Sequence, residues 1–116
     1  MQAAEVEPKR TQRYVDEAFR QVLVKPGVED VLIMNRSGVP VKTSMQPQDA
    51  LQHACLYDNL REKTQAFLQK MDPPENLCMF RVRTKFHEVI ITPDAKISVL
   101  VVQNARDTYL GNQNTE

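Results

Sequence analysis

The residues that could carry nucleophilic or metal chemistry are two histidines and two cysteines, which form two candidate pairs. His53 and Cys55 are two positions apart in a segment with helical periodicity. Their side chains therefore diverge by about 200 degrees and cannot form a nucleophile and base pair. His87 and Cys78 could share one face of a sheet, but the further ligands of a zinc site are missing. We interpret His87 as a buried, hydrogen-bonded histidine.

The glycines and the carboxylates offer no better site. The chain has only three glycines and contains neither the GxxxxGK[ST] nor the GxGxxG phosphate motif. Gly38, in the stretch NRSGVPVKTS, does not open a helix, so we interpret it as a permissive turn residue. The acidic pairs Asp16-Glu17 and Glu29-Asp30 are sequence neighbours that point apart or lie at turns, as solvated charge does. We therefore predict a protein that is not an enzyme and has no cofactor or metal.

Composition narrows the class of protein further. A chain of 116 residues fits one domain, and its 15 basic and 15 acidic residues give no net charge to attract nucleic acid or anionic lipid. We find no apolar run long enough for a membrane span and no signal peptide. Cys55 and Cys78 lie in apolar sequence without a CxxC pair, which favours a reduced, intracellular setting. The expectation is a soluble cytoplasmic protein without membrane insertion or a nucleic-acid partner.

Apolar periodicity predicts a helix, two strands, a second helix and three strands. We expect residues 1–8 and 105–116 to be loosely ordered ends that flank one domain over residues 9–104. The predicted elements are a helix from Lys9 to the Pro26-Gly27 pair, strands over Val28–Met34 and Val39–Ser44, a helix over Gln48–Met71, and strands over Leu77–Arg83, Phe86–Thr92 and Ile97–Gln103.

The strand compositions predict their order in the sheet. Val28–Met34 and Ile97–Gln103 are apolar almost throughout, which is typical of central strands covered on both faces. Pro40 cannot donate a ladder hydrogen bond, so the second strand belongs at an edge. Hairpin connections then give the order 2-1-5-4-3, with the third strand at the far edge. The fold class is α/β (α+β): a five-stranded antiparallel sheet with one helix on each face.

The third and fourth strands are joined by a short connection, for which we predict the two-residue turn Thr84-Lys85. This turn would place Arg81 opposite Glu88 and sort the side chains by face. One set, under the second helix, contains Cys78, Phe80, Val82, His87, Val89 and Ile91. The other set is the predicted partner groove: Leu77, Met79, Arg81, Arg83, Phe86, Glu88 and Ile90. Its mixture of apolar and charged groups suits an amphipathic partner helix, unless the first helix covers it.

The far edge also predicts self-association. The sequence Leu77-Cys78-Met79-Phe80 is apolar and β-prone, and such an edge invites pairing with an identical strand, unless Arg81 and Arg83 act as gatekeepers. The second helix has apolar residues on more than one side, which suits packing against a second copy or burial within one chain. The predicted dimer interface consists of His53, Tyr57, Leu60, Thr64, Phe67, Leu77, Cys78, Met79, Phe80 and Arg81.

Several spaced blocks of the sequence closely resemble the roadblock family of cytoplasmic dynein light chains, across roughly Val28 to Asn104. The blocks are NRSGVPVKTSM, MDPPENLCMFRVRTKFHEVIITPD and ISVLVVQN, and the specific matches include Gly38-Val39-Pro40-Val41, Asp72-Pro73, Phe80-Arg81-Val82-Arg83, Glu88 and Pro93-Asp94. The chain departs from the family in a longer first helix, in Cys78 and in a tail after Asn104. These departures indicate a divergent paralogue.

The resemblance implies partners that the composition does not. It implies a dimer, with itself or a related light chain, whose third strands join into a continuous ten-stranded sheet. It also implies binding to a helical segment of the dynein intermediate chain, and so a role in cargo attachment and minus-end-directed transport on microtubules. Roadblock-like domains also serve as scaffolds or regulators of small GTPases, which is the alternative. A third possibility, a profilin-like module for proline-rich peptides, lacks an aromatic platform because the chain has no Trp.

Overall fold

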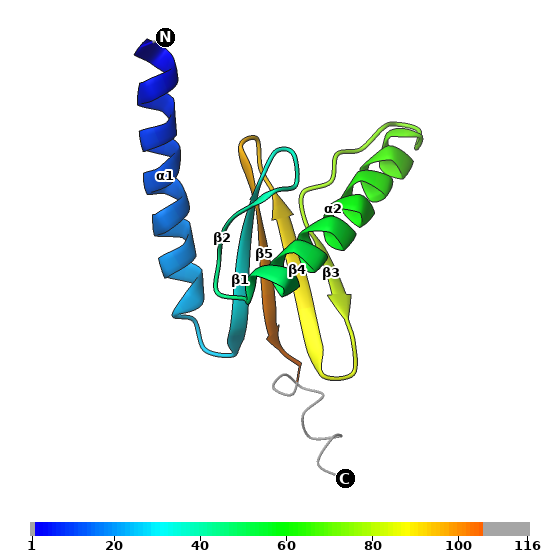
Figure 1. Cartoon of the computed structure of the whole chain (residues 1–116). Helices are drawn as coiled ribbons and strands as arrows, with labels where there is room; N and C mark the ends of the chain where they lie inside the picture. Colours follow the sequence, from blue (N-terminus) through cyan, green and yellow to red (C-terminus); the bar gives the residue numbers. More distant parts are fainter. Residues whose placement is uncertain (1, 106–116) are drawn as a thin grey trace.

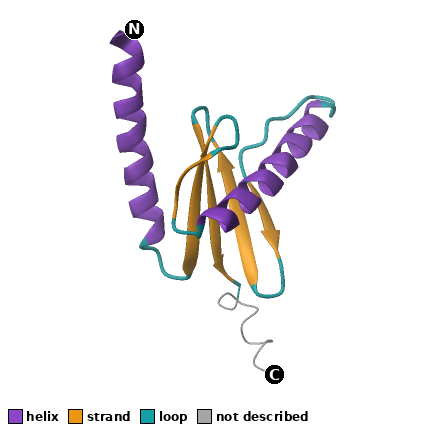
Figure 2. Ribbon diagram, in the orientation of Figure 1, coloured by secondary structure: helices purple, strands orange, loops and turns teal. Residues whose placement is uncertain are grey.

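Two helices and five strands follow one another in the predicted order (Figures 1 and 2). The structure is a computed structural model that describes the backbone of residues 2–105 and the side chains of residues 12–105. The strands form one antiparallel sheet in the order β2-β1-β5-β4-β3, as predicted. The elements are α1 (Gln2–Leu23), β1 (Val28–Asn35), β2 (Pro40–Thr43), α2 (Pro47–Gln69), β3 (Phe80–Arg83), β4 (His87–Pro93) and β5 (Ile97–Asn104).

The sheet has a buried layer on each face, because β1 alternates its side chains between the two helices. Val31 and Ile33 pack with Val15 of α1. Leu32 and Met34 join the second cluster, which contains Ala50 and Ala54 of α2 together with Val89, Ile91, Leu100 and Val102 from β4 and β5. The prediction of a central strand apolar on both faces is confirmed.

Helix α1 begins at Gln2 and not at Lys9, so residues 2–8 are helical where we predicted a loosely ordered end. Apolar periodicity does not predict this part of the helix, because its sequence is polar and has no sheet to cover. Good helix formers such as Ala3 and Ala4 nevertheless continue the helix. Figure 1 shows the first turns of α1 extending past the sheet. Of the tail predicted over residues 105–116, Ala105 is buried, and the rest lies outside the described residues.

Helix α2 starts with Pro47 in its first turn, where a missing N–H costs nothing. It buries only two small residues, Ala50 and Ala54, against the sheet. Larger apolar side chains remain in solvent: Leu51 is 63% exposed and Phe67 is 57% exposed. This confirms the prediction that α2 has more apolar surface than one sheet face can cover.

The hairpin between β1 and β2 is built by Asn35 and Gly38. The Asn35 side-chain oxygen accepts hydrogen bonds from the N–H of Ser37 at 2.9 Å and of Val39 at 3.1 Å. Gly38 has a φ of 80°, the left-handed region that its turn requires. The stretch NRSGVPVKTS thus forms a turn and the edge strand β2, as predicted.

Strand β3 is shorter than predicted, since it begins at Phe80 and leaves Leu77, Cys78 and Met79 in a loop. The preceding residues are tied to α2. The Leu77 N–H donates to the Gln65 side chain at 2.9 Å, and the Gln69 side chain donates to the carbonyl of Glu75 at 2.7 Å. Because these bonds hold the segment against the helix, it cannot follow the sheet edge.

The turn between β3 and β4 also differs from the prediction. Thr84 closes it, with its N–H donating to the His87 carbonyl at 2.8 Å, so Lys85 and Phe86 are the central residues. Arg83 therefore lies opposite Glu88, and Arg81 lies opposite Ile90. The shift of two positions leaves each side chain on its predicted face, because the side-chain period of a strand is two.

His87 is the second correction in this region. It is exposed at the start of β4 and pairs with Glu29 at 3.2 Å, whereas we expected a buried histidine. The displaced turn explains the difference, because His87 lies at the end of the hairpin and beyond the reach of α2.

Candidate functional site

One part of the sheet is left uncovered on the side where α1 packs. Helix α1 lies against β1 and β2, and its apolar contacts reach only the Ile97 and Val99 end of β5. We call the remaining surface the open face. It comprises Arg81 and Arg83 of β3, Glu88 and Ile90 of β4, and Val101 and Gln103 of β5.

The strand registers arrange the open face in two rows. Arg83, Glu88 and Gln103 lie side by side in the first row, next to the turn between β3 and β4. The second row consists of Arg81, Ile90 and Val101. Ile90 and Val101 are partly exposed, so the surface combines a small apolar centre with a polar end.

Glu88 is the polar centre of the open face. Only 7% of the residue is exposed, yet its carboxylate has three donors: Arg81 Nε at 3.0 Å, Arg81 Nη2 at 3.3 Å and Gln103 Nε2 at 3.1 Å. Burial raises the pKa of Glu88, but these hydrogen bonds and the positive charges of Arg81 and Arg83 outweigh it and lower the pKa. The carboxylate is therefore charged at neutral pH and fixes the Arg81 guanidinium in place.

The other arginine of the open face holds the end of the described chain. Arg83 Nη2 donates to the carbonyl oxygen of Ala105. On the neighbouring hairpin the Phe86 carbonyl accepts from the N–H of Ala105 at 3.3 Å. Ala105 is itself buried. Ala105, the last described residue, thus lies beside the first row of the open face.

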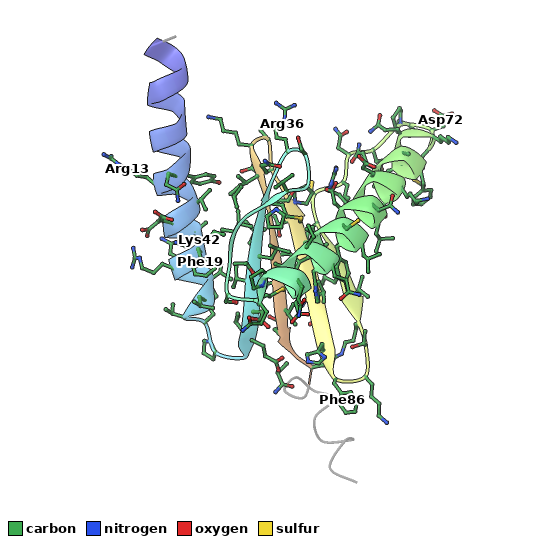
Figure 3. The ribbon with its side chains drawn as sticks, in the orientation of Figure 1. Arg13, Phe19, Arg36, Lys42, Asp72 and Phe86 are labelled. Atoms are coloured by element: carbon green, nitrogen blue, oxygen red, sulfur yellow. The ribbon has the colours of Figure 1, made fainter. Side chains whose placement is uncertain are left out.

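The structure brings together four of the seven residues predicted for the partner groove, namely Arg81, Arg83, Glu88 and Ile90. Phe86 lies instead at the tip of the β3–β4 turn (Figure 3), and Leu77 and Met79 lie in the loop before β3. Val101 and Gln103 were missed. Continuing the register from β4 through the Pro93-Asp94-Ala95 turn would have found them, because both alternate onto the face of Ile90.

The residues predicted for a dimer interface differ in how much of their side chains is exposed to contact by a second chain. On α2, Leu60 and Phe67 are exposed, whereas Tyr57 is partly packed in the core. His53 stacks on Tyr57 with ring centroids 5.9 Å apart, and its Nδ1 lies 2.8 Å from the carbonyl oxygen of Asp49. Thr64 donates its hydroxyl to the carbonyl of Leu60.

Beyond α2, Phe80 packs against the core cluster, Leu77 is partly buried, and Met79 is 48% exposed in the loop. Cys55 and Cys78 are free thiols and are exposed, whereas we expected Cys78 to lie under the second helix. The assignment of these residues to an interface between copies stays a prediction.

A second surface feature lies at the opposite end of the sheet, between α1 and β2. It is an open groove of about 630 Å³ lined by Arg13, Asp16, Glu17, Phe19, Arg20, Leu23, Val24 and Lys42. Figure 3 shows Lys42 next to Phe19, over whose ring its Nζ lies at 5.2 Å. Lys42 also pairs with Asp16, and Arg20 pairs with Glu17, so much of the charge around this groove is already satisfied.

Across the side chains that the structure describes, no three His, Cys, Asp or Glu residues lie close enough to hold a metal ion. In the same part of the chain, no helix is long and apolar enough to cross a membrane.

The family model for the Roadblock/LC7 domain matches residues 14–104. Among solved structures, the chain is similar to a Roadblock/LC7 domain from Streptomyces avermitilis, with a TM-score of 0.63 and 11% identity over 68% of each chain. It is also similar to the gliding protein MglB from Thermus thermophilus, with a TM-score of 0.66 and 14% identity over 85% of this chain and 76% of that one.

An MglB structure described as having a tetrameric arrangement matches as well, with a TM-score of 0.68 and 14% identity over 89% of this chain and 79% of that one. At such low identities, these likenesses show the fold.

Proposed function

We propose, from the premise that this chain belongs to the Roadblock/LC7 domain family, that it is a non-catalytic scaffold that associates with itself and binds or regulates a small GTPase through the open face. The family resemblance offers two partner classes, a small GTPase and a helical segment of the dynein intermediate chain. The composition of the open face favours the first.

Four of the six side chains of the open face are charged or carry an amide, and only Ile90 and Val101 are apolar. A helix bound in a groove normally inserts a row of apolar anchors, for which two partly exposed residues provide little surface. A mixed surface with a fixed arginine suits a folded partner that binds reversibly. This composition is the observation that carries the proposal.

The open edge of β3 supports self-association. The Thr84 N–H points toward β4, so by alternation the N–H groups of Arg81 and Arg83 point outward from the sheet edge. The edge is therefore open to another strand, and the exposed Met79 and Phe67 add apolar surface. The similar MglB structure with a tetrameric arrangement shows that this fold is found in assemblies of several copies.

The second candidate is a dynein light chain that binds a helix of the intermediate chain. The sequence blocks between Val28 and Asn104 favour it, since they resemble the light-chain family in order and spacing. In a dimer joined at β3, two open faces would lie next to each other and form a longer floor than one chain provides. That floor could hold an amphipathic helix.

A direct titration separates the two candidates. Small GTPases, each loaded with GDP or with a non-hydrolysable GTP analogue, and a helical intermediate-chain peptide are titrated against the purified full chain, and binding is followed by calorimetry. We expect a nucleotide-dependent complex with a GTPase. Binding of the peptide alone would replace the first candidate with the second. Absence of both complexes, with a folded and self-associated chain, would contradict both.

A matched pair of variants locates the contact. Arg81→Gln removes a charge from the open face but keeps a donor near Glu88, whereas Arg36→Gln removes a charge from the exposed β1–β2 hairpin. We expect partner affinity to fall by roughly tenfold for Arg81→Gln, the effect of losing about 1.4 kcal/mol. Arg36→Gln should bind like the wild type. Equal effects of the two substitutions would show that the open face is not the binding site.

A further inference from the structure

The edge strand β3 carries both of its arginines on the open face, next to the edge that is free to pair. We propose that self-association through this edge builds one anion site from two copies, and that the site binds an acidic segment of a protein partner. We call this site the arginine seam; it consists of Arg81 and Arg83 of each copy. The inference deepens the proposed function and rests on its self-association.

The backbone of β3 limits how two copies can pair. The strand is Phe80–Arg83, and the N–H groups of Arg81 and Arg83 point outward from the sheet edge. In an antiparallel pair with its twofold axis normal to the sheet, residues directly opposite each other lie on the same face. Two registers then pair three β3 residues of each copy. The axis passes beside Arg81 in one register and beside Val82 in the other.

Both registers bring arginines of the two copies together. With the axis at Val82, Arg81 of each copy lies opposite Arg83 of the other copy. With the axis at Arg81, the two Arg81 residues lie opposite each other and Arg83 is their diagonal neighbour. Opposite side chains have Cβ atoms about 5 Å apart, and diagonal neighbours are about 7–8 Å apart. In either register the long guanidinium side chains can therefore reach one common ligand.

The arginine seam has more positive charge than its own carboxylates neutralise. Arg81 binds Glu88 through Nε at 3.0 Å and Nη2 at 3.3 Å. This side-on pair leaves Nη1 of Arg81 available, and the side chain is 51% exposed. Arg83 donates to the neutral carbonyl of Ala105 and forms no ion pair within the part of the chain whose side chains are described. Each copy therefore adds one uncompensated positive charge.

The surroundings of the arginine seam indicate which anion it binds. Planar guanidinium groups bind carboxylates through paired hydrogen bonds. Beside them on the open face, Ile90 and Val101 are partly exposed and can pack against apolar side chains. A small inorganic anion would contact the arginines alone and leave this apolar surface uncovered. The charged and apolar parts together fit an acidic protein segment that also carries apolar residues.

Ligand binding and self-association should strengthen each other at this site. Like charges directly opposite each other on paired strands are destabilising, so the arginine seam weakens contact between copies when it holds no anion. A ligand that binds the joined strands better than the single chain shifts the equilibrium toward the joined form by mass action. The assembly should therefore be tightest when an acidic segment is bound.

The test measures self-association of the full chain and needs no identified partner. Sedimentation equilibrium gives the dissociation constant between copies with an oligoglutamate peptide, with an oligolysine peptide or with sodium sulfate, all at one ionic strength. We expect oligoglutamate to tighten self-association by about fivefold, the effect of relieving one or two like-charge pairs. Oligolysine should not tighten it. An equal effect of sulfate would reveal a site for small anions and overturn the assignment to an acidic segment.

A matched set of variants locates the effect. Arg83→Gln removes one charge per copy from the arginine seam and keeps a donor for the Ala105 carbonyl, whereas Arg83→Lys keeps the charge. Arg36→Gln removes the same charge from the β1–β2 hairpin (Figure 3). Without peptide, Arg83→Gln should self-associate more tightly than wild type, and it should lose most of the response to oligoglutamate. Arg83→Lys and Arg36→Gln should respond like wild type.

The failure of this inference can be told apart from the failure of the proposed function. A wild type that self-associates without responding to oligoglutamate, or that responds equally to Arg83→Gln, would overturn the arginine seam and leave the proposed scaffold intact. A wild type that stays a single chain under every condition would contradict the proposed self-association, and the arginine seam with it.

Discussion

Gly38 is required at its turn for two separate reasons, its backbone conformation and its close approach to α2. Its φ is 80°, and a Cβ built on it would lie 2.6 Å from the Asp58 Oδ2 atom. Gly27 has a similar φ of 84°. The Asp58 contact is therefore a cost of substitution at Gly38 that adds to the strain of a positive φ.

We predict that Gly38→Ala lowers the free energy of unfolding by about 2–3 kcal/mol, because it combines the strain of a positive φ with the overlap with Asp58. From the strain of its φ alone, Gly27→Ala should cost about 1 kcal/mol. Urea denaturation monitored by circular dichroism measures both. Adding Asp58→Ala to Gly38→Ala should recover part of the loss. If Asp58→Ala recovered none of the loss, the Asp58 contact would have no energetic weight.

The charge of Glu88 should make stability depend on pH. Its pKa is lowered in the folded chain, because hydrogen bonds from Gln103 and Arg81 outweigh the opposing effect of burial. A group whose folded pKa is lowered stabilises the protein above its unfolded pKa, roughly 4.3 for Glu, and loses this contribution as the pH falls through the folded value. We expect wild type to be more stable than Glu88→Gln at pH 7 and the difference to shrink as the pH falls below the unfolded pKa of roughly 4.3 and through the lowered folded value. A difference independent of pH would contradict this role.

At the scale of elements, the loop before β3 and the exposed surface of α2 should stabilise contact between copies. Met79 lies in that loop and is 48% exposed. The substitution Met79→Asp places a charge there and should weaken self-association by roughly tenfold or more. The circular dichroism spectrum should stay unchanged. Val24→Asp is the control, because Val24 is 75% exposed just after the end of α1, which packs at the other side of the sheet from β3. Sedimentation velocity compares the two variants. Equal behaviour would remove the β3 end from the interface.

The sequence predicts elements well where apolar periodicity decides them, and less well where side-chain hydrogen bonds do. The alternation in β1, the edge position set by Pro40 and the strand order all follow from hydrophobic pattern and proline chemistry. The start of β3 does not, because Gln65 and Gln69 hold the preceding segment, and no periodicity reveals that contact. The β3–β4 turn was misplaced for the same reason, since the Thr84 hydroxyl donates to the His87 carbonyl and accepts from the His87 N–H.

Part of the open face could be predicted, because residues on β3 and β4 keep their faces when the register shifts by two. Arg81 and Glu88 were therefore recognised as partners, although they pair diagonally and not directly across the strands. The contribution of β5 was missed because the register was not continued across the next hairpin. The anchoring of Ala105 by Arg83 has no signal in the sequence, since it joins residues 22 positions apart.

At the scale of the whole molecule, the two ends of the sheet have different roles. Around β2, α1 fills the sheet face and Lys42 ties the helix to the strand through Asp16 and Phe19. Around β3, the edge is unpaired in the single chain, the open face is uncovered and apolar side chains are exposed. A second copy joined at β3 would place two open faces next to each other, and this arrangement is what makes the chain a scaffold in our account.

The central claim is that the chain works as a self-associating scaffold, and its molar mass in solution tests this most directly. Light scattering coupled to size-exclusion chromatography measures the mass independently of shape. One chain has a mass of 13.3 kDa. Our account predicts a main species of twice that mass at micromolar concentration, shifted toward one chain by Met79→Asp. A wild type that keeps the mass of a single chain as its concentration is raised would contradict the account.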